Sequence, residues 1–179
     1  FIALDLISQS EHSSDTFCYL ITNSEKTAKR VNEIISKLLP KIQRKELVKS
    51  SLSKNGFIAV CKNNSDMINL ANSLAPEHLQ IMTKNPKLIS SKITSAGLIL
   101  LGNYSPSSAS DYILGSNHIL PTNGFGKIRG SLSVMDFIKI NTEVTVSKSS
   151  LSKISKHLNT LTTSEGLPNH YEAVGGRLQ

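Results

Sequence analysis

The sequence contains no tryptophan, and aromatic residues make up only 5% of its 179 residues. Cysteine is also sparse: Cys18 and Cys61 have no CxxC partner and no adjacent histidine. Each lies in an apolar run, so we expect buried, reduced, structural thiols and a cytoplasmic setting. No apolar run approaches the roughly 20 residues of a membrane-spanning helix. The residues from Phe1 onward lack the charged and apolar regions of a signal peptide.

Negative charge is in deficit, because 13 acidic residues oppose 20 lysines and arginines and give a formal charge of +7. A basic excess is compatible with nucleic-acid binding. However, the lysines are scattered, and the densest basic stretch, residues 41–49, alternates with apolar residues at helical spacing. Few aromatic residues are available to stack on bases. A solvated basic surface is therefore the favoured interpretation, and we expect no nucleic-acid partner and no membrane partner.

Short apolar runs alternate with segments of helical periodicity along the first hundred residues. Residues 1–12 are typical of the end of a helix, and strands are expected over 16–22, 57–61, 78–82 and 97–101. Helices are expected over 24–39, 41–52, 65–74 and 86–92. Strands that alternate with helices predict an α/β fold with a mainly parallel sheet flanked by helices.

Residues 102–131 are rich in glycine, asparagine, serine and proline, which predicts a long and mostly irregular segment. Loops of this length are uncommon and are usually functional. Residues 141–147 alternate like an exposed strand, and helices are expected over 150–161 and 167–174. These last segments predict a small helical appendage at the C-terminal end.

Two pairs of polar residues lie at the ends of predicted elements. Gln9 and His12 are three residues apart, so on a helix they point the same way. Glu77 and His78 stand at the start of a predicted strand, where an adjacent acid and base can serve proton transfer. Each pair taken alone is also typical of an ordinary protein surface.

Two further pairs lie toward the C-terminal end. Asp111 and His118 are seven residues apart in the long loop, and Glu165 and His170 are five apart around a glycine. Two histidines, one aspartate and an amide oxygen together suit zinc or manganese. His157 belongs to no cluster and is interpreted as a solvated helix residue. The residues by themselves thus indicate metal-assisted chemistry on a small polar substrate, and they do not select the reaction.

Taken together, in their order and spacing, several segments resemble the histidinol dehydrogenase family over essentially the whole chain. They are residues 5–12 (DLISQSEH), 71–72 (AN), 75–79 (APEHL), 95–97 (SAG), 101–102 (LG), 111–112 (DY), 115–122 (GSNHILPT), 131–134 (SLSV) with Phe137, and 165–167 (EGL) with His170.

The resemblance implies an enzyme that oxidises L-histidinol to L-histidine in two NAD-dependent steps through histidinaldehyde, the last reaction of histidine biosynthesis. It implies that His78 takes the alcohol proton and that Glu77 activates water for the second oxidation. The zinc ligands that it implies are Gln9, His12, Asp111 and His170, and the substrate-binding residues are these four together with His78, His118 and Glu165.

The resemblance also implies a homodimer in which the C-terminal segment completes the neighbouring subunit's site. Residues 1–132 are expected to form the second half of a Rossmann-like catalytic domain, and residues 133–179 a small C-terminal domain that reaches the partner. No glycine-rich turn connects a strand to a helix, so the NAD-binding segment is expected to lie outside this sequence. The isolated chain is then expected to be inactive as a dehydrogenase. The alternative is a non-catalytic remnant that binds zinc or histidinol.

Overall fold

The computed structural model describes residues 1–179, which form two compact units, Phe1–Phe137 and Ile138–Gln179. None of the helices is both long enough and apolar enough to cross a membrane.

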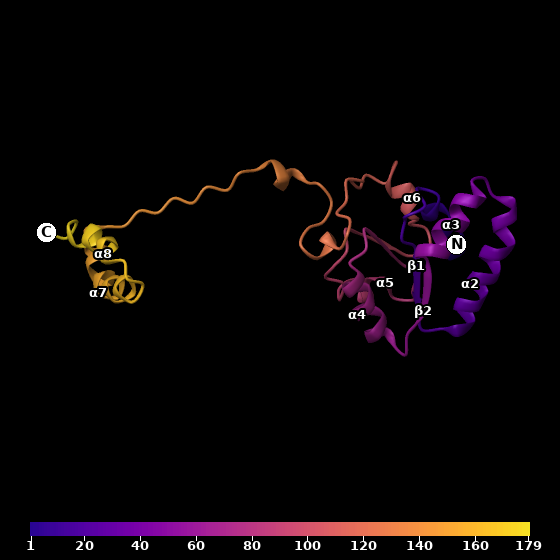
Figure 1. Cartoon of the computed structure of the whole chain (residues 1–179), viewed down its shortest axis with the longest axis horizontal. Helices are drawn as coiled ribbons and strands as arrows, with labels where there is room; N and C mark the ends of the chain where they lie inside the picture. The colour runs from indigo at the N-terminus through magenta and orange to yellow at the C-terminus, as the bar shows by residue number, and fades with distance from the viewer. The chain divides into compact units, whose positions relative to one another are not determined.

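The first unit has a mixed α/β architecture, as the sequence predicts (Figure 1). Its strands are β1 (Tyr19–Thr22), β2 (Phe57–Val60), β3 (His78–Ile81) and β4 (Leu98–Leu101). Its α-helices are α1 (Ile2–Ser10), α2 (Glu25–Leu38), α3 (Lys45–Asn55), α4 (Asn64–Leu74), α5 (Pro86–Ser90) and α6 (Ser107–Ser110). Short 3₁₀ turns are η1 (Leu39–Lys41), η2 (Phe125–Lys127) and η3 (Val134–Phe137).

All strand pairing in the unit is parallel, which confirms the prediction from the alternating pattern. β1 pairs with β2, with Tyr19 opposite Phe57, and β3 pairs with β4, with His78 opposite Leu98. The strands form two separate two-stranded sheets and not one continuous sheet. Within each sheet a helical connection joins the two strands, as parallel pairing requires.

Side-chain caps and apolar faces explain where the long helices begin and how they pack. The Ser24 hydroxyl accepts a hydrogen bond from the Thr27 amide at 3.2 Å and caps α2. The Asn63 side chain caps α4 through the Asp66 amide. α2 and α3 lie on one side of β1 and β2, and α4 lies on the other (Figure 1). On α2, Val31 is buried, and the other apolar residues of that face are half-buried: Ala28, Ile34, Ile35 and Leu38.

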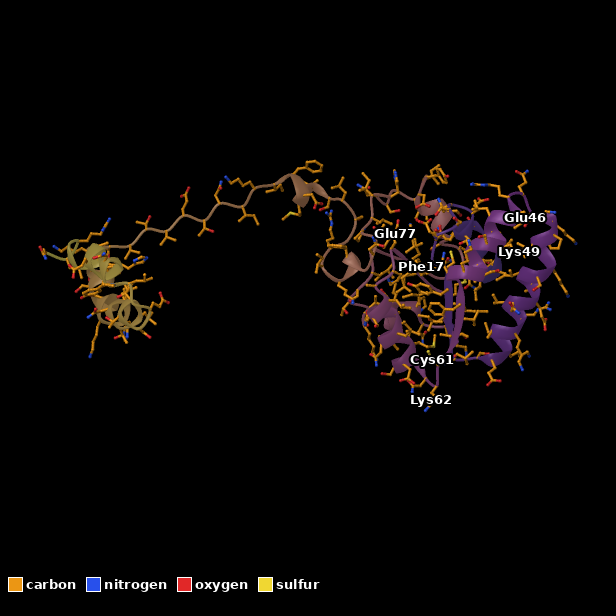
Figure 2. All side chains as sticks on the ribbon, in the orientation of Figure 1. Phe17, Glu46, Lys49, Cys61, Lys62 and Glu77 are labelled. Carbon is orange, nitrogen blue, oxygen red and sulfur yellow. The ribbon has the colours of Figure 1, made fainter.

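The buried core of the first unit includes residues of α1, α2 and α3. Val48 on α3 has no exposed surface, and Ala3 and Ile7 on α1 and Val31 on α2 are also buried. Cys18 is buried beside β1, and Cys61 follows β2 and is half-buried. Burial raises the pKa of the Cys18 thiol to about 11, so this thiol is protonated and unreactive near neutrality. Cys61 and Lys62 lie at the opposite side of the unit from Glu77, which precedes β3 (Figure 2).

The second unit is a pair of helices, α7 (Lys148–Ser164) and α8 (Pro168–Gly175). The Ser155 and Tyr171 hydroxyls lie 3.0 Å apart and link the two helices. The strand predicted over residues 141–147 is wrong, because these residues are extended, exposed and outside any sheet. Alternation of apolar and polar residues does not make a strand without a partner strand to accept its hydrogen bonds.

Candidate active site

The Glu77–His78 pair is positioned by the turn that ends α4. Ala75 has a left-handed conformation, with φ of 46°, and Pro76 then directs the chain into β3. The Glu77 carbonyl accepts the Leu98 amide at 2.8 Å, and the Pro76 carbonyl accepts the Gly97 amide at 2.9 Å. These bonds fix the backbone of the pair to the start of β4.

The His78 side chain meets Asp111, at the end of α6, and Glu77 beside it in the sequence. The His78 Nε2 atom lies 3.2 Å from Asp111 Oδ1, and the His78 Nδ1 atom lies 3.9 Å from Glu77 Oε1. The His78 side chain is 15% exposed and that of Asp111 20%, whereas Glu77 is more open to solvent at 41%. An imidazole thus lies between two carboxylates that are 34 positions apart in the sequence.

The end of α1 packs against α6, which brings Gln9 close to the Asp111 segment. The Gln9 Nε2 atom donates to the Ser107 hydroxyl oxygen at 2.6 Å, and Ser107 is buried. Asp111 is the C-cap of α6, and its amide donates to the Ser107 carbonyl. His12 lies in the turn that follows α1 and is exposed.

The long loop after α6 returns to the start of β4. A Cβ atom placed on Gly97 would lie 2.7 Å from the Glu77 carbonyl oxygen and 3.0 Å from Pro121 Cδ. His118, which is exposed, precedes Pro121 by three residues. The Asn117 side chain donates to the Leu132 carbonyl at 3.0 Å and closes this part of the loop.

Glu165 and His170 belong to the second unit, where they flank the turn between its helices. Glu165 is the C-cap of α7, and His170 lies in the first turn of α8. Gly166 between them has a φ of 70°, a left-handed conformation that glycine adopts without strain. Both side chains are exposed.

Comparison with known proteins identifies the family. The sequence matches the family described as histidinol dehydrogenase over residues 1–178. A histidinol dehydrogenase of Oceanobacillus iheyensis is 40% identical over 174 residues, covering 97% of this chain and 41% of that protein. A histidinol dehydrogenase of Methanocaldococcus jannaschii is 39% identical over 179 residues, covering 100% of this chain and 41% of that protein. The crystal structure of histidinol dehydrogenase from Elizabethkingia anophelis superposes with a TM-score of 0.86 at 34% identity, covering 99% of this chain and 41% of that one.

The chain belongs to the histidinol dehydrogenase family. It spans about two fifths of the length of the curated relatives that it matches, since each match covers 41% of the relative.

The side chains near the end of α6 include donor types that zinc accepts. Gln9 and Asp111 lie on elements that pack together, and the bond from Gln9 Nε2 leaves its Oε1 atom available to a cation. An amide oxygen, a carboxylate and imidazole nitrogens are ligands that zinc accepts. No group of three or more His, Cys, Asp or Glu side chains in the chain is arranged to hold a metal ion. Gln9, His12 and Asp111 belong to the first unit, and His170 belongs to the second.

Two residues near the candidate site were not found from the sequence. Ser107 contacts Gln9 across 98 positions of sequence, and no pattern around residue 107 indicates a buried partner. Gly97 was expected only as the start of a strand, and its closeness to the Glu77 carbonyl depends on the pairing of β3 and β4.

Replacing Gly97 with alanine is expected to destabilise the first unit by about 1–3 kcal/mol, the usual cost of inserting a methyl group into a packed region. The new Cβ atom would lie 2.7 Å from the Glu77 carbonyl oxygen, and a backbone atom cannot move aside as a flexible side chain can. Alanine also restricts the unfolded chain more than glycine does, but this stabilising effect of about 0.4–1 kcal/mol offsets only part of the loss. Urea denaturation followed by circular dichroism measures the change.

Gly130→Ala provides the matched control for the Gly97 variant. A Cβ atom at Gly130 would lie 3.6 Å from the Gly97 carbonyl oxygen, which is an ordinary van der Waals contact. The unfolding midpoint of this control is expected to stay near that of the unsubstituted chain. Equal midpoints for both variants would show that the close approach at Gly97 has no energetic consequence.

Proposed function

We propose that this chain carries the metal-binding, substrate-binding and proton-transfer residues of a zinc-dependent histidinol dehydrogenase. The reaction is the oxidation of L-histidinol to L-histidine through histidinaldehyde, with NAD as the hydride acceptor. The observation that carries the proposal is the placement of His78 between Asp111 and Glu77 in a chain that matches the family over residues 1–178. L-Histidinol has the imidazole, amine and hydroxyl groups that such a set of residues can bind.

His78 is the base that takes the hydroxyl proton of the substrate. Its Nε2 atom, 3.2 Å from the Asp111 carboxylate, is suited to carry the hydrogen, which leaves the Nδ1 lone pair free to accept a proton. A carboxylate hydrogen-bonded to an imidazole fixes the ring and stabilises the imidazolium that forms. Removing the hydroxyl proton as hydride leaves carbon is the acid–base work that the first oxidation requires.

Glu77 is the base for the second oxidation, in which the aldehyde must first be hydrated. Its carboxylate is the more exposed member of the pair, at 41%, so water reaches it readily. Glu77 Oε1 lies 3.9 Å from His78 Nδ1, close enough for both groups to act on one substrate carbon in succession. Two adjacent bases thus suit two successive proton removals.

Gln9, His12, Asp111 and His170 are the residues that would hold zinc. When bound, zinc supplies a fixed positive charge that orients the imidazole and amine of the substrate. Gln9, His12, Asp111 and His170, together with His78, His118 and Glu165, form the substrate-binding set. Glu165 and His170 are proposed to act in the partner subunit's site, which makes the enzyme a homodimer with shared sites.

NAD is proposed to bind outside this chain, which spans 41% of its relatives' length and has no glycine-rich turn between a strand and a helix. Residues 1–132 are assigned to the second half of the catalytic domain and residues 133–179 to the small C-terminal domain. We assign the enzyme to the cytoplasm, where free thiols such as Cys18 stay reduced. The lack of a glycine-rich turn for NAD favours a second candidate function, a non-catalytic portion that binds zinc and histidinol without turnover.

Calorimetric titration of the purified chain with L-histidinol tests the proposal. Binding is expected with zinc present and is expected to be lost after chelation. Absence of binding in both conditions from a folded chain would contradict the proposal. NADH formation from L-histidinol and NAD separates the two candidates, because only a complete dehydrogenase turns over.

A further inference from the structure

We infer that Ser107 is a positioning residue that orients the Gln9 amide for metal coordination. The inference rests on the proposed function, which makes Gln9 a zinc ligand. The observation behind it is the 2.6 Å hydrogen bond from Gln9 Nε2 to the Ser107 hydroxyl oxygen. Ser107 is 4% exposed, so water does not compete freely for this hydroxyl.

The bond to Ser107 leaves the oxygen end of the Gln9 amide free to face the metal. A primary amide presents an oxygen at one end and an NH₂ group at the other, and only the oxygen is a useful ligand for a cation. Because Gln9 Nε2 donates to Ser107, its Oε1 atom is the atom left free. Without an acceptor at residue 107, the amide is free to rotate and to present either end.

Helix α6 connects two of the proposed zinc ligands, Gln9 and Asp111. Ser107 begins the helix and holds Gln9, and Asp111 caps its end. The Asp111 amide donates to the Ser107 carbonyl at 3.2 Å, and the Ser110 hydroxyl donates to the same carbonyl at 2.6 Å. A shift of Ser107 therefore moves the Asp111 backbone as well.

The test replaces Ser107 with alanine in the 179-residue chain and measures zinc affinity by competition with a chromogenic chelator. Zinc binding is expected to weaken by about 10–100-fold, the usual effect of removing a group that orients a metal ligand. Ser108→Ala is the matched control, since Ser108 lies on the same helix and does not bond to Gln9. Its zinc affinity is expected to match that of the unsubstituted chain.

Repeating the Ser107→Ala substitution in a Gln9→Ala chain distinguishes an effect on the orientation of Gln9 from a general effect on packing. If Ser107 acts through Gln9, then Ser107→Ala has no further effect on zinc affinity in a Gln9→Ala chain. An equal loss in both backgrounds would overturn the inference. Equal zinc affinity of the Ser107→Ala chain and the unsubstituted chain would overturn it too, while leaving the ligand assignment intact. If the unsubstituted chain does not bind zinc, the ligand assignment itself fails, and the inference with it.

A measurement on the unsubstituted chain keeps the inference testable if Ser107→Ala does not fold. The side-chain amide hydrogens of Gln9 are expected to exchange with solvent more slowly than those of exposed Gln43, both before and after zinc is added. Nuclear magnetic resonance of the ¹⁵N-labelled chain follows both groups. Equally fast exchange at Gln9 and Gln43 in the zinc-bound chain would overturn the inference.

Discussion

Zinc binding is expected to weaken by more than about 100-fold when His12 is replaced by alanine, because loss of an outer-shell group alone costs 10–100-fold. His12 supplies one of the four donors in the proposed site, and its side chain is exposed, so its removal leaves no cavity. The loss should therefore appear in metal affinity and not in stability. Chelator competition measures the first, and thermal unfolding by circular dichroism measures the second.

His157→Ala is the matched control for this prediction. His157 is an exposed histidine on α7 that has no place in the proposed site. The same substitution at this position is expected to leave zinc affinity and unfolding temperature unchanged. The ligand assignment would be contradicted if both variants bound zinc as tightly as the unsubstituted chain. A parallel loss in both would instead indicate nonspecific binding of zinc by histidines.

The second large effect concerns the core: replacing Val48 with aspartate is expected to prevent the first unit from folding. Val48 has no exposed surface, and the helix that carries it, α3, packs against α1. An unpaired buried carboxylate costs several kcal/mol. That loss is comparable with the entire stability of a small domain, about 5–15 kcal/mol. The expected result is loss of cooperative thermal unfolding together with loss of zinc binding.

Lys49→Asp introduces the same side chain at the next position of α3, which is exposed (Figure 2). Exposed substitutions usually change stability by less than about 0.5 kcal/mol. This control is therefore expected to unfold cooperatively, near the temperature of the unsubstituted chain. A folded Val48→Asp chain with an unchanged transition would show that residue 48 is not in the core.

Local signals were sufficient for most helices and strands of the first unit. The helix expected over residues 24–39 begins at Glu25, because the Ser24 side chain caps its first free amides. The helix expected over residues 65–74 ends at Leu74, because Pro76 disfavours a helical conformation in the residue before it. The strand prediction for residues 141–147 was wrong because a strand needs a partner strand, and the pattern within one segment contains no information about that partner.

Part of the candidate site was also predictable, because Glu77 and His78 are adjacent in the chain. The contact between His78 and Asp111 could not be predicted, because 33 positions separate the two residues and only the packing of α6 near β3 brings them together. The resemblance to a family placed Asp111 in the site, but no spacing rule gave its 3.2 Å distance from His78.

The sequence by itself determined the family, the α/β class and the identity of the chemical groups, because these depend on residue type and on short-range periodicity. Only the tertiary structure decided how those groups are held. The bond from Gln9 to Ser107 and the contact of Gly97 with the Glu77 carbonyl join segments distant in sequence. Such contacts form only when burial of apolar surface fixes the helices and strands against one another. Their geometry is therefore a property of the packed chain and not of any one segment.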